Sequence, residues 1–176
     1  MLVSAGARDQ TLIARLSGRL GAPAWLLIIG CISAALSAAV MAFAGGAIAG
    51  FLALAGKQML VAMALVLAAV ELAWNRAERA LAEPTRSFFA IFAVLVMRQL
   101  GDGARFLIFA IAVATPSPLA AGVGGALGGM AALCAGWALG DDLEARLPLR
   151  PARRGLAALL LAAGIFAALN ARGLIG

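Results

Sequence analysis

Residues 88–114 read FFAIFAVLVMRQLGDGARFLIFAIAVA, and this stretch decides what kind of protein the chain is. Two arginines and an aspartate, Arg98, Asp102 and Arg105, stand between two runs of phenylalanine, isoleucine, leucine, valine and alanine. A helix needs about 20 predominantly apolar residues to cross a bilayer, so the stretch is long enough to do so. Ionisable side chains in such a segment are costly and usually mark a functional site. We therefore predict one membrane helix from Ser87 to Ala114, with a polar group at mid-membrane.

The composition of the whole chain indicates an all-α integral membrane protein. Of its 176 residues, 64% are hydrophobic and 12% are charged, whereas soluble domains are about 45–50% apolar and about 25% charged. The formal net charge of +6 does not indicate nucleic-acid binding, because the basic residues mostly form short clusters between apolar runs, as membrane topology requires. The chain has no histidine, and Cys31 and Cys134 lie within apolar runs. We therefore expect no cofactor, no zinc site and no catalytic thiol.

Apolar segments bounded by glycine, proline or charge predict about six transmembrane helices. The first twenty residues have a helical pattern, but their four charged residues predict that the first helix is short. The other five predicted helices run from Pro23 to Phe43 or as far as Leu54, from Gln58 to Asn75, from Ser87 to Ala114, from Pro118 to Gly140 and from Arg154 to Ala171.

The distribution of basic residues predicts the orientation, because Lys and Arg in short loops mark the cytoplasmic side. With six crossings, only Lys57 and Arg172 fall on the outer face. The tryptophans lie near the basic ends of their helices, as an aromatic belt requires. We predict a multi-pass protein of the cell membrane, the bacterial inner membrane, with both termini outside and the acidic residues 141–144 in a cytoplasmic loop. The arginines predicted on the cytoplasmic face are Arg15, Arg19, Arg76, Arg79, Arg86, Arg146, Arg150, Arg153 and Arg154.

An internal repeat appears when the sequence is shifted by 95 residues, which aligns Pro23 with Pro118 and Gly30 with Gly125. Three helices per copy would insert the second copy upside down, which is a transporter architecture. The predicted organisation is a first three-helix repeat at 1–75, a basic cytoplasmic linker at 76–86 and a second three-helix repeat at 87–176. Chance similarity between alanine- and glycine-rich segments is the alternative. The residues aligned with 88–95 would precede Met1, so we expect the first helix to be about two turns shorter than the helix that begins at Ser87. A true start codon upstream of Met1 is one explanation.

Gln99-Leu100-Gly101-Asp102 resembles the Glu-x-Gly-Asp-[Lys/Arg]-[Ser/Thr] signature of the Gdt-one (transmembrane protein 165) family of small cation/proton exchangers. The duplicated six-helix plan is similar too, and the likeness covers essentially the whole chain. In that family the signature occurs twice, and the resemblance implies that the Glu and Asp of both copies gather into one acidic cation site.

This sequence departs from the family signature in both copies. In the second copy Gln99 takes the Glu position, Gly101 and Asp102 are kept, and Arg105 replaces a following Gln. In the first copy Ser4 takes the Glu position and Ala7 the Asp position, while Arg8 and Gln10 are kept and Asp9 takes the hydroxyl position. Of the four family carboxylates only Asp102 remains, which makes Asp102 the one candidate metal ligand that the resemblance implies.

Charge predicts that this core has lost its divalent-cation cage. Asp9 and Asp102 face three basic residues, Arg8, Arg98 and Arg105, and Ca²⁺ and Mn²⁺ need several hard oxygen ligands. Asp9 also follows Ala7 by two residues, a rotation of about 200° on a helix, which points its side chain away from the family position. On one continuous helix, Arg98 and Arg105 can both reach Asp102.

Two interpretations of this polar group remain open. In one, Asp102 titrates or ligates an ion, and in the other the arginines and Asp102 form a self-neutralised relic. Glu71 and Asn170 lie near helix ends, and we expect both at the membrane interface.

Architecture and resemblance together predict a divergent secondary transporter related to Ca²⁺/Mn²⁺:H⁺ exchangers, with an altered substrate. The alternative is a non-transporting membrane protein that keeps the exchanger fold to bind a partner. An enzyme is not expected, because the chain has no histidine or tyrosine, and its intramembrane serines have no evident base.

Overall fold

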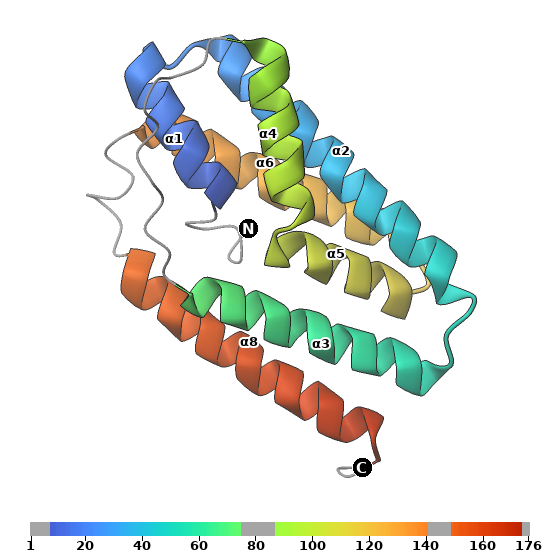
Figure 1. The fold of residues 1–176 in the computed structure, drawn as a ribbon. Coiled ribbons are helices and arrows are strands. Elements are labelled where there is room, and N and C mark those ends of the chain that lie inside the picture. The colour runs from blue at the N-terminus through green and yellow to red at the C-terminus, as the bar shows by residue number, and fades with distance from the viewer. Residues whose placement is uncertain (1–7, 75–86, 141–148, 174–176) are drawn as a thin grey trace.

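The computed structural model describes residues 8–74, 87–140 and 149–173, and within these ranges the chain forms seven α-helices and no strand (Figure 1). The helices are α1 (Arg8–Leu20), α2 (Ala24–Ala49), α3 (Leu54–Ala73), α4 (Phe88–Leu100), α5 (Gly103–Ala114), α6 (Pro118–Leu139) and α8 (Leu149–Ala171). The predicted linker 76–86, Ser4 and the acidic residues 141–144 lie outside the described residues.

Four of these helices are long and apolar enough to cross a membrane, namely α2, α3, α6 and residues Arg153–Ala171 of α8. α4 and α5 are shorter apolar helices. The prediction of an all-α, multi-pass membrane protein is confirmed at this level. α3 begins at Leu54 rather than Gln58, and α8 begins at Leu149 rather than Arg154. The early start of α8 places Pro151 in the first helical turn, where a missing backbone N–H costs little.

The prediction of a single helix from Ser87 to Ala114 is wrong, because the chain leaves the helix at Gly101 and Asp102. Asp102 adopts extended backbone angles, φ −88° and ψ 141°, and occupies the N-cap position of α5. Its carbonyl oxygen accepts the backbone N–H groups of Arg105 and Phe106 at 3.0 and 3.2 Å. Glycine is a poor helix former and aspartate is a preferred N-cap residue, so the Gly-Asp-Gly sequence favours a restart at this point.

The helices bury small residues and expose large apolar ones, which is the pattern expected where the surroundings are lipid. On α2 every buried residue except Leu26 is small, namely Gly30, Ser33, Ala34, Ser37, Ala38, Ala42 and Gly45, whereas Ile28, Ile32, Leu36, Val40 and Phe43 are exposed. Small interfacial residues let membrane helices approach closely. At Gly45, an added Cβ would lie 2.6 Å from the backbone oxygen of Phe109, so α2 and α5 are in backbone contact.

α1 and α5 both begin in the middle of the molecule and run in opposite directions (Figure 1). α1 runs toward the end where α2 begins, and α5 runs toward the end where α6 begins. α1 packs on α6, and α5 packs on α2 and α3. Trp137 Nε1 donates to the backbone oxygen of Pro23 at 3.2 Å, which joins the end of α6 to the start of α2. The first turns of α1 and α5 therefore both lie in the middle of the molecule, at a distance from both ends of the bundle (Figure 1).

Candidate functional site

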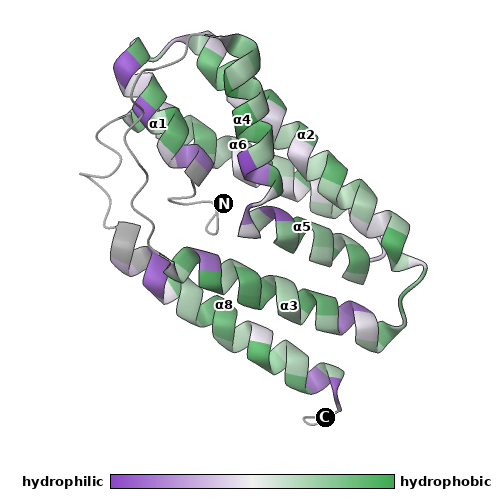
Figure 2. Cartoon of the chain, in the orientation of Figure 1, coloured by the Kyte–Doolittle hydropathy of each residue, from purple (hydrophilic) through white to green (hydrophobic). Residues whose placement is uncertain are grey.

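A chain of buried polar side chains links four helices at the place where α1 and α5 begin. Gln99 Nε2, at the end of α4, donates to Asp9 Oδ2 on α1 at 3.2 Å. Ser37 Oγ on α2 donates to Gln99 Oε1 at 2.9 Å. Arg105 Nε on α5 donates to Ser37 Oγ at 3.0 Å. Figure 2 shows hydrophilic residues interrupting the apolar helices where α4 meets α5 and at the start of α1.

Every hydrogen bond in this chain is donated in the direction from the arginine toward the aspartate. The four residues are at most 4% exposed, so each hydrogen bond is shielded from water. Hydrogen bonds in a low-dielectric interior are electrostatically strong, and an unsatisfied member would be costly. Gln99 fits this position because its amide group donates to one neighbour and accepts from the other. A glutamate at position 99 would have no N–H to offer the Asp9 carboxylate.

Asp9 therefore lies inside the polar site, although its distance of two residues from Ala7 predicted the opposite face. Ala7 itself lies outside the described residues. The Asp9 carboxylate is 4% exposed, and its Oδ1 accepts the backbone N–H of Gln10 at 2.8 Å. A carboxylate in the first turn of a helix is stabilised by the helix dipole.

Asp102 stands at the break between α4 and α5 with an unsatisfied oxygen. Its side chain makes no capping hydrogen bond, and its Oδ2 is buried without a hydrogen-bond partner. The Asp102 carboxyl interacts electrostatically with the carboxyls of Asp9 and Glu71 and with the guanidinium of Arg105. Buried polar atoms are nearly always hydrogen-bonded, so an orphaned carboxylate oxygen is an unusual feature that calls for a functional reason.

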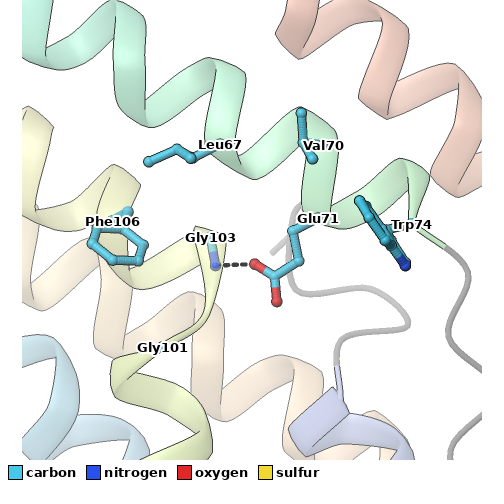
Figure 3. Close-up of a pocket in the computed structure, with 7 residues that line it drawn as sticks. All are labelled: Leu67, Val70, Glu71, Trp74, Gly101, Gly103 and Phe106. Atoms are coloured by element: carbon cyan, nitrogen blue, oxygen red, sulfur yellow. Dashed lines mark hydrogen bonds between the residues drawn. The ribbon is translucent and has the colours of Figure 1, made fainter.

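Glu71, on α3, also contributes to the site, although the sequence suggested only a place near a helix end for it. Its position at the membrane interface stays a prediction. Its Oε2 accepts the backbone N–H of Gly103, the first residue of α5 (Figure 3). An added Cβ at Gly103 would lie 2.7 Å from Ala68 Cα and 2.7 Å from Glu71 Oε2. Glycine at this position is what lets α3 bring its carboxylate to the N-terminus of α5.

A pocket of about 330 Å³ lies beside the Glu71 carboxylate, between α3 and the α4–α5 break (Figure 3). Leu67, Val70, Trp74 and Phe106 form its apolar walls, and Gly101 and Gly103 complete its lining. Leu67, Val70, Trp74 and Phe106 are between 39% and 58% exposed, so the pocket opens on the outside of the helix bundle. The pocket therefore offers a route between the surroundings and the first turn of α5.

Arg105 is the largest fully buried side chain of the described residues, with 1% of its surface exposed. The structure records no ion pair between Arg105 and Asp102, because the helix break replaces the continuous stripe that the sequence predicted. The guanidinium instead lies against Gly129 of α6, where an added Cβ would be 3.1 Å from Nη2. Arg105 Nη2 is buried without a hydrogen-bond partner.

The remaining predicted residues have supporting positions. Gln10 Nε2 donates to the backbone oxygen of Ala132 at 3.0 Å and so ties α1 to α6. Gly101 ends α4 as its C-cap, and Arg98 is half-buried in the last turn of α4. Arg8 begins α1. Ser4 lies outside the described residues.

Three site residues were missed by the sequence analysis, namely Glu71, Ser37 and Gly129. Glu71 carried a signal, because an ionisable residue in an otherwise apolar membrane helix indicates function by default. Ser37 and Gly129 carried none, because small residues are common throughout α2 and α6.

The oxygen atoms at this site suit a hard cation, although no three acidic, cysteine or histidine side chains of the described residues are grouped closely enough to hold a metal ion together. Asp9, Asp102 and Glu71 carry carboxylates and Gln99 carries a neutral oxygen, which are the ligand types that Ca²⁺ and Mn²⁺ prefer. The structure thus adds the Glu71 carboxylate to the two aspartates that the sequence predicted.

A family model for the divalent cation/proton antiporter GDT1 matches residues 87–174, which is half of the chain. No curated protein and no solved structure matches the chain. The matched region contains α4, α5, α6 and α8, and with them Gln99, Asp102 and Arg105. The chain therefore belongs to the GDT1 family of divalent cation/proton antiporters.

Proposed function

We propose that this protein is a secondary transporter of the cell membrane that exchanges a divalent cation, Mn²⁺ or Ca²⁺, for protons at Asp102. The observation that carries the proposal is the buried Oδ2 of Asp102, which has no hydrogen-bond partner at the break between α4 and α5. An ion or a proton bound there would satisfy this oxygen. Membership of a divalent cation/proton antiporter family supports the reaction class.

Three carboxylates explain how cation and proton can compete for one site. Asp9 and Glu71 interact electrostatically with Asp102, so the three negative charges repel each other when the site is empty. A divalent cation relieves that repulsion directly, and protons relieve it by neutralising the carboxylates. Glu71 supplies, from α3, a carboxylate in place of the one lost at Gln99. With Glu71 included, three carboxylates stand against the three arginines of the predicted core, so their formal charges balance.

The arrangement of the helices supports inverted repeats as the basis of alternating access. When the chain is shifted by 95 residues, the first residue of α1 falls on Gly103, which is the first residue of α5. The same shift places the first residue of α3 on Leu149, which is the first residue of α8. The shift brings the first residue of α2 to within one residue of Pro118, where α6 begins. α1 packs on α6 as α5 packs on α2, which is the exchange that a two-fold relation between repeats requires.

Transport by the purified protein in liposomes tests the proposal. We expect Mn²⁺ or Ca²⁺ entry to depend on an outward proton gradient and to be accompanied by proton release. Asp102→Asn keeps the shape of the side chain but removes its charge, so transport should fall by about tenfold or more, equivalent to about 1.4 kcal/mol. Glu71→Gln should lower the apparent cation affinity, because one of three carboxylates is lost.

Asp142→Asn is the matched control, since it makes the same chemical change in the predicted cytoplasmic loop, and it should transport like the unmodified protein. Full transport by Asp102→Asn would contradict the proposed role of this residue. If the folded, unmodified protein moved neither cation, the result would favour the alternative of a non-transporting protein. The buried guanidinium of Arg105 is the observation that supports this alternative.

A further inference from the structure

Two buried side-chain atoms of the described residues lack a hydrogen-bond partner, and they have opposite charge. They are Oδ2 of Asp102 and Nη2 of Arg105, three residues apart across the start of α5. The two groups interact electrostatically, yet the structure records no ion pair between them. Each is thus the natural partner of the other, and in this conformation the two are held apart.

Contacts on two other helices hold the Arg105 guanidinium in its place. Ser37 Oγ on α2 accepts from Nε at 3.0 Å. On α6, Gly129 leaves the space that the guanidinium fills, because an added Cβ would lie 3.1 Å from Nη2 and 3.4 Å from Nη1. The hydrogen bond uses only Nε, so the two terminal nitrogens can change partners while the stem of the side chain stays buried.

We infer that Arg105 is a tethered cation that competes with the transported ion for Asp102. When the site is empty, the guanidinium pairs with the Asp102 carboxylate, and when a divalent cation arrives, it withdraws toward Ser37 and Gly129. Arg105 is then a specificity-determining residue that weakens cation binding. This inference rests on the proposed function, since it assumes that a cation binds at Asp102.

The physical reason is that two positive groups cannot share one carboxylate without mutual repulsion. A charge buried at the helix break is poorly screened by salt, so its effect on an incoming divalent ion is large. A planar guanidinium that cannot lose its proton is suited to this competition, because its charge persists at every physiological pH. The permanent positive charge of Arg105 also limits the electrostatic cost of an empty site within the membrane, because it offsets part of the negative charge of the carboxylates.

Mn²⁺ binding to the full-length protein in detergent, measured by calorimetric titration, tests the inference separately from transport. Arg105→Gln removes the charge and should bind Mn²⁺ at least about tenfold more tightly than the unmodified protein. Arg105→Lys keeps the charge and should stay within about threefold of the unmodified protein. Arg172→Gln removes an exposed arginine beyond the end of α8 and is the matched control for net charge.

Ser37→Ala provides a second test that retains the arginine and decides the matter if Arg105→Gln does not fold. Without its hydrogen bond to Ser37, the guanidinium should pair with Asp102 more often, so Mn²⁺ affinity should fall rather than rise. Size-exclusion chromatography and thermal unfolding establish that each variant is folded.

The possible results separate the inference from the proposed function. Tighter binding by Arg105→Gln supports the inference, most strongly if the unmodified protein binds no Mn²⁺ at all. Equal Mn²⁺ affinities of Arg105→Gln and the unmodified protein would overturn the inference and leave the proposed function standing. If Arg105→Gln does not fold, equal Mn²⁺ affinities of Ser37→Ala and the unmodified protein would do the same. Absence of Mn²⁺ and Ca²⁺ binding by every folded variant would overturn both.

Discussion

Gln99 shows how a single amide can hold a charged site together. Its side chain joins Asp9 to Ser37, and through Ser37 it connects Asp9 to Arg105. An amide can donate to a carboxylate through its NH₂ group and accept from a hydroxyl through its oxygen at the same time. At the residue scale, the amide at position 99 therefore ties the buried carboxylate of Asp9 to the rest of the hydrogen-bonded chain.

Replacement of Gln99 by leucine should destabilise the protein by about 1–3 kcal/mol, because the buried Asp9 carboxylate loses the hydrogen bond that Gln99 donates to its Oδ2. Ser37 Oγ keeps the backbone oxygen of Ala34 as an acceptor. Thermal unfolding in detergent measures the effect. Gln58→Leu is the control, because it makes the same change in α3 away from this chain, and it should shift the midpoint little. Equal shifts in the two variants would show that the hydrogen-bonded chain does not contribute to stability.

At the scale of the helices, the break between α4 and α5 is the feature that builds the site. It turns one predicted span into two half-helices and exposes the N-terminus of α5 to Glu71. Broken helices at membrane depth are tolerated where they are buried in protein or line a cavity. Gly103 makes the arrangement possible, because α3 contacts α5 at the place where any other residue would have its Cβ.

Gly103→Ala should separate α3 from α5, because the new Cβ would lie 2.7 Å from Ala68 Cα, a backbone atom that cannot turn aside. We expect a loss of stability of about 1–3 kcal/mol, as for other overpacked sites, together with a loss of transport. The matched variant is Gly101→Ala on the other side of Asp102, where the nearest atoms to an added Cβ are 3.9 Å away. Thermal unfolding and flux should both be near normal for Gly101→Ala, and a similar defect in the two variants would rule out the α3–α5 contact as the cause.

At the scale of the whole molecule, the half-helices α1 and α5 both begin in the middle and diverge toward opposite ends of the bundle (Figure 1). Their N-terminal dipoles are thus directed at one interior region, where carboxylates from α1, from the break and from α3 collect. Positive dipole ends favour these negative charges. The proposed inverted repeat would account for this arrangement with one duplicated three-helix unit.

The inverted repeat predicts that equivalent turns face opposite sides of the membrane. Ala22, between α1 and α2, and Ser117, between α5 and α6, are exposed and lie 95 positions apart. In a protein with Cys31 and Cys134 replaced by serine, Ala22→Cys should react with a membrane-impermeant thiol reagent from the cytoplasmic side and Ser117→Cys from the outer side. Labelling of both from the same side would exclude the inverted arrangement.

The sequence by itself determined the class of the protein, its family and most of its helices. Composition and span length identified a multi-pass helical membrane protein, because the bilayer admits few alternatives. The Gly101-Asp102 motif led to the family that the comparison supports. Proline and glycine marked the bounds of α6 to within a residue, since these residues act locally on the backbone.

Only the tertiary structure decided which side chains meet. Asp9 and Gln99 are 90 residues apart in the chain, and Glu71 and Gly103 are 32 apart, so no local pattern links them. The sequence analysis also missed the helix break, because apolar residues continue on both sides of Gly101 and outweighed the local signal of the Gly-Asp-Gly sequence. Small residues such as Gly103 and Gly129 decide which helix faces can approach each other. That choice is made by the packing of all the helices at once.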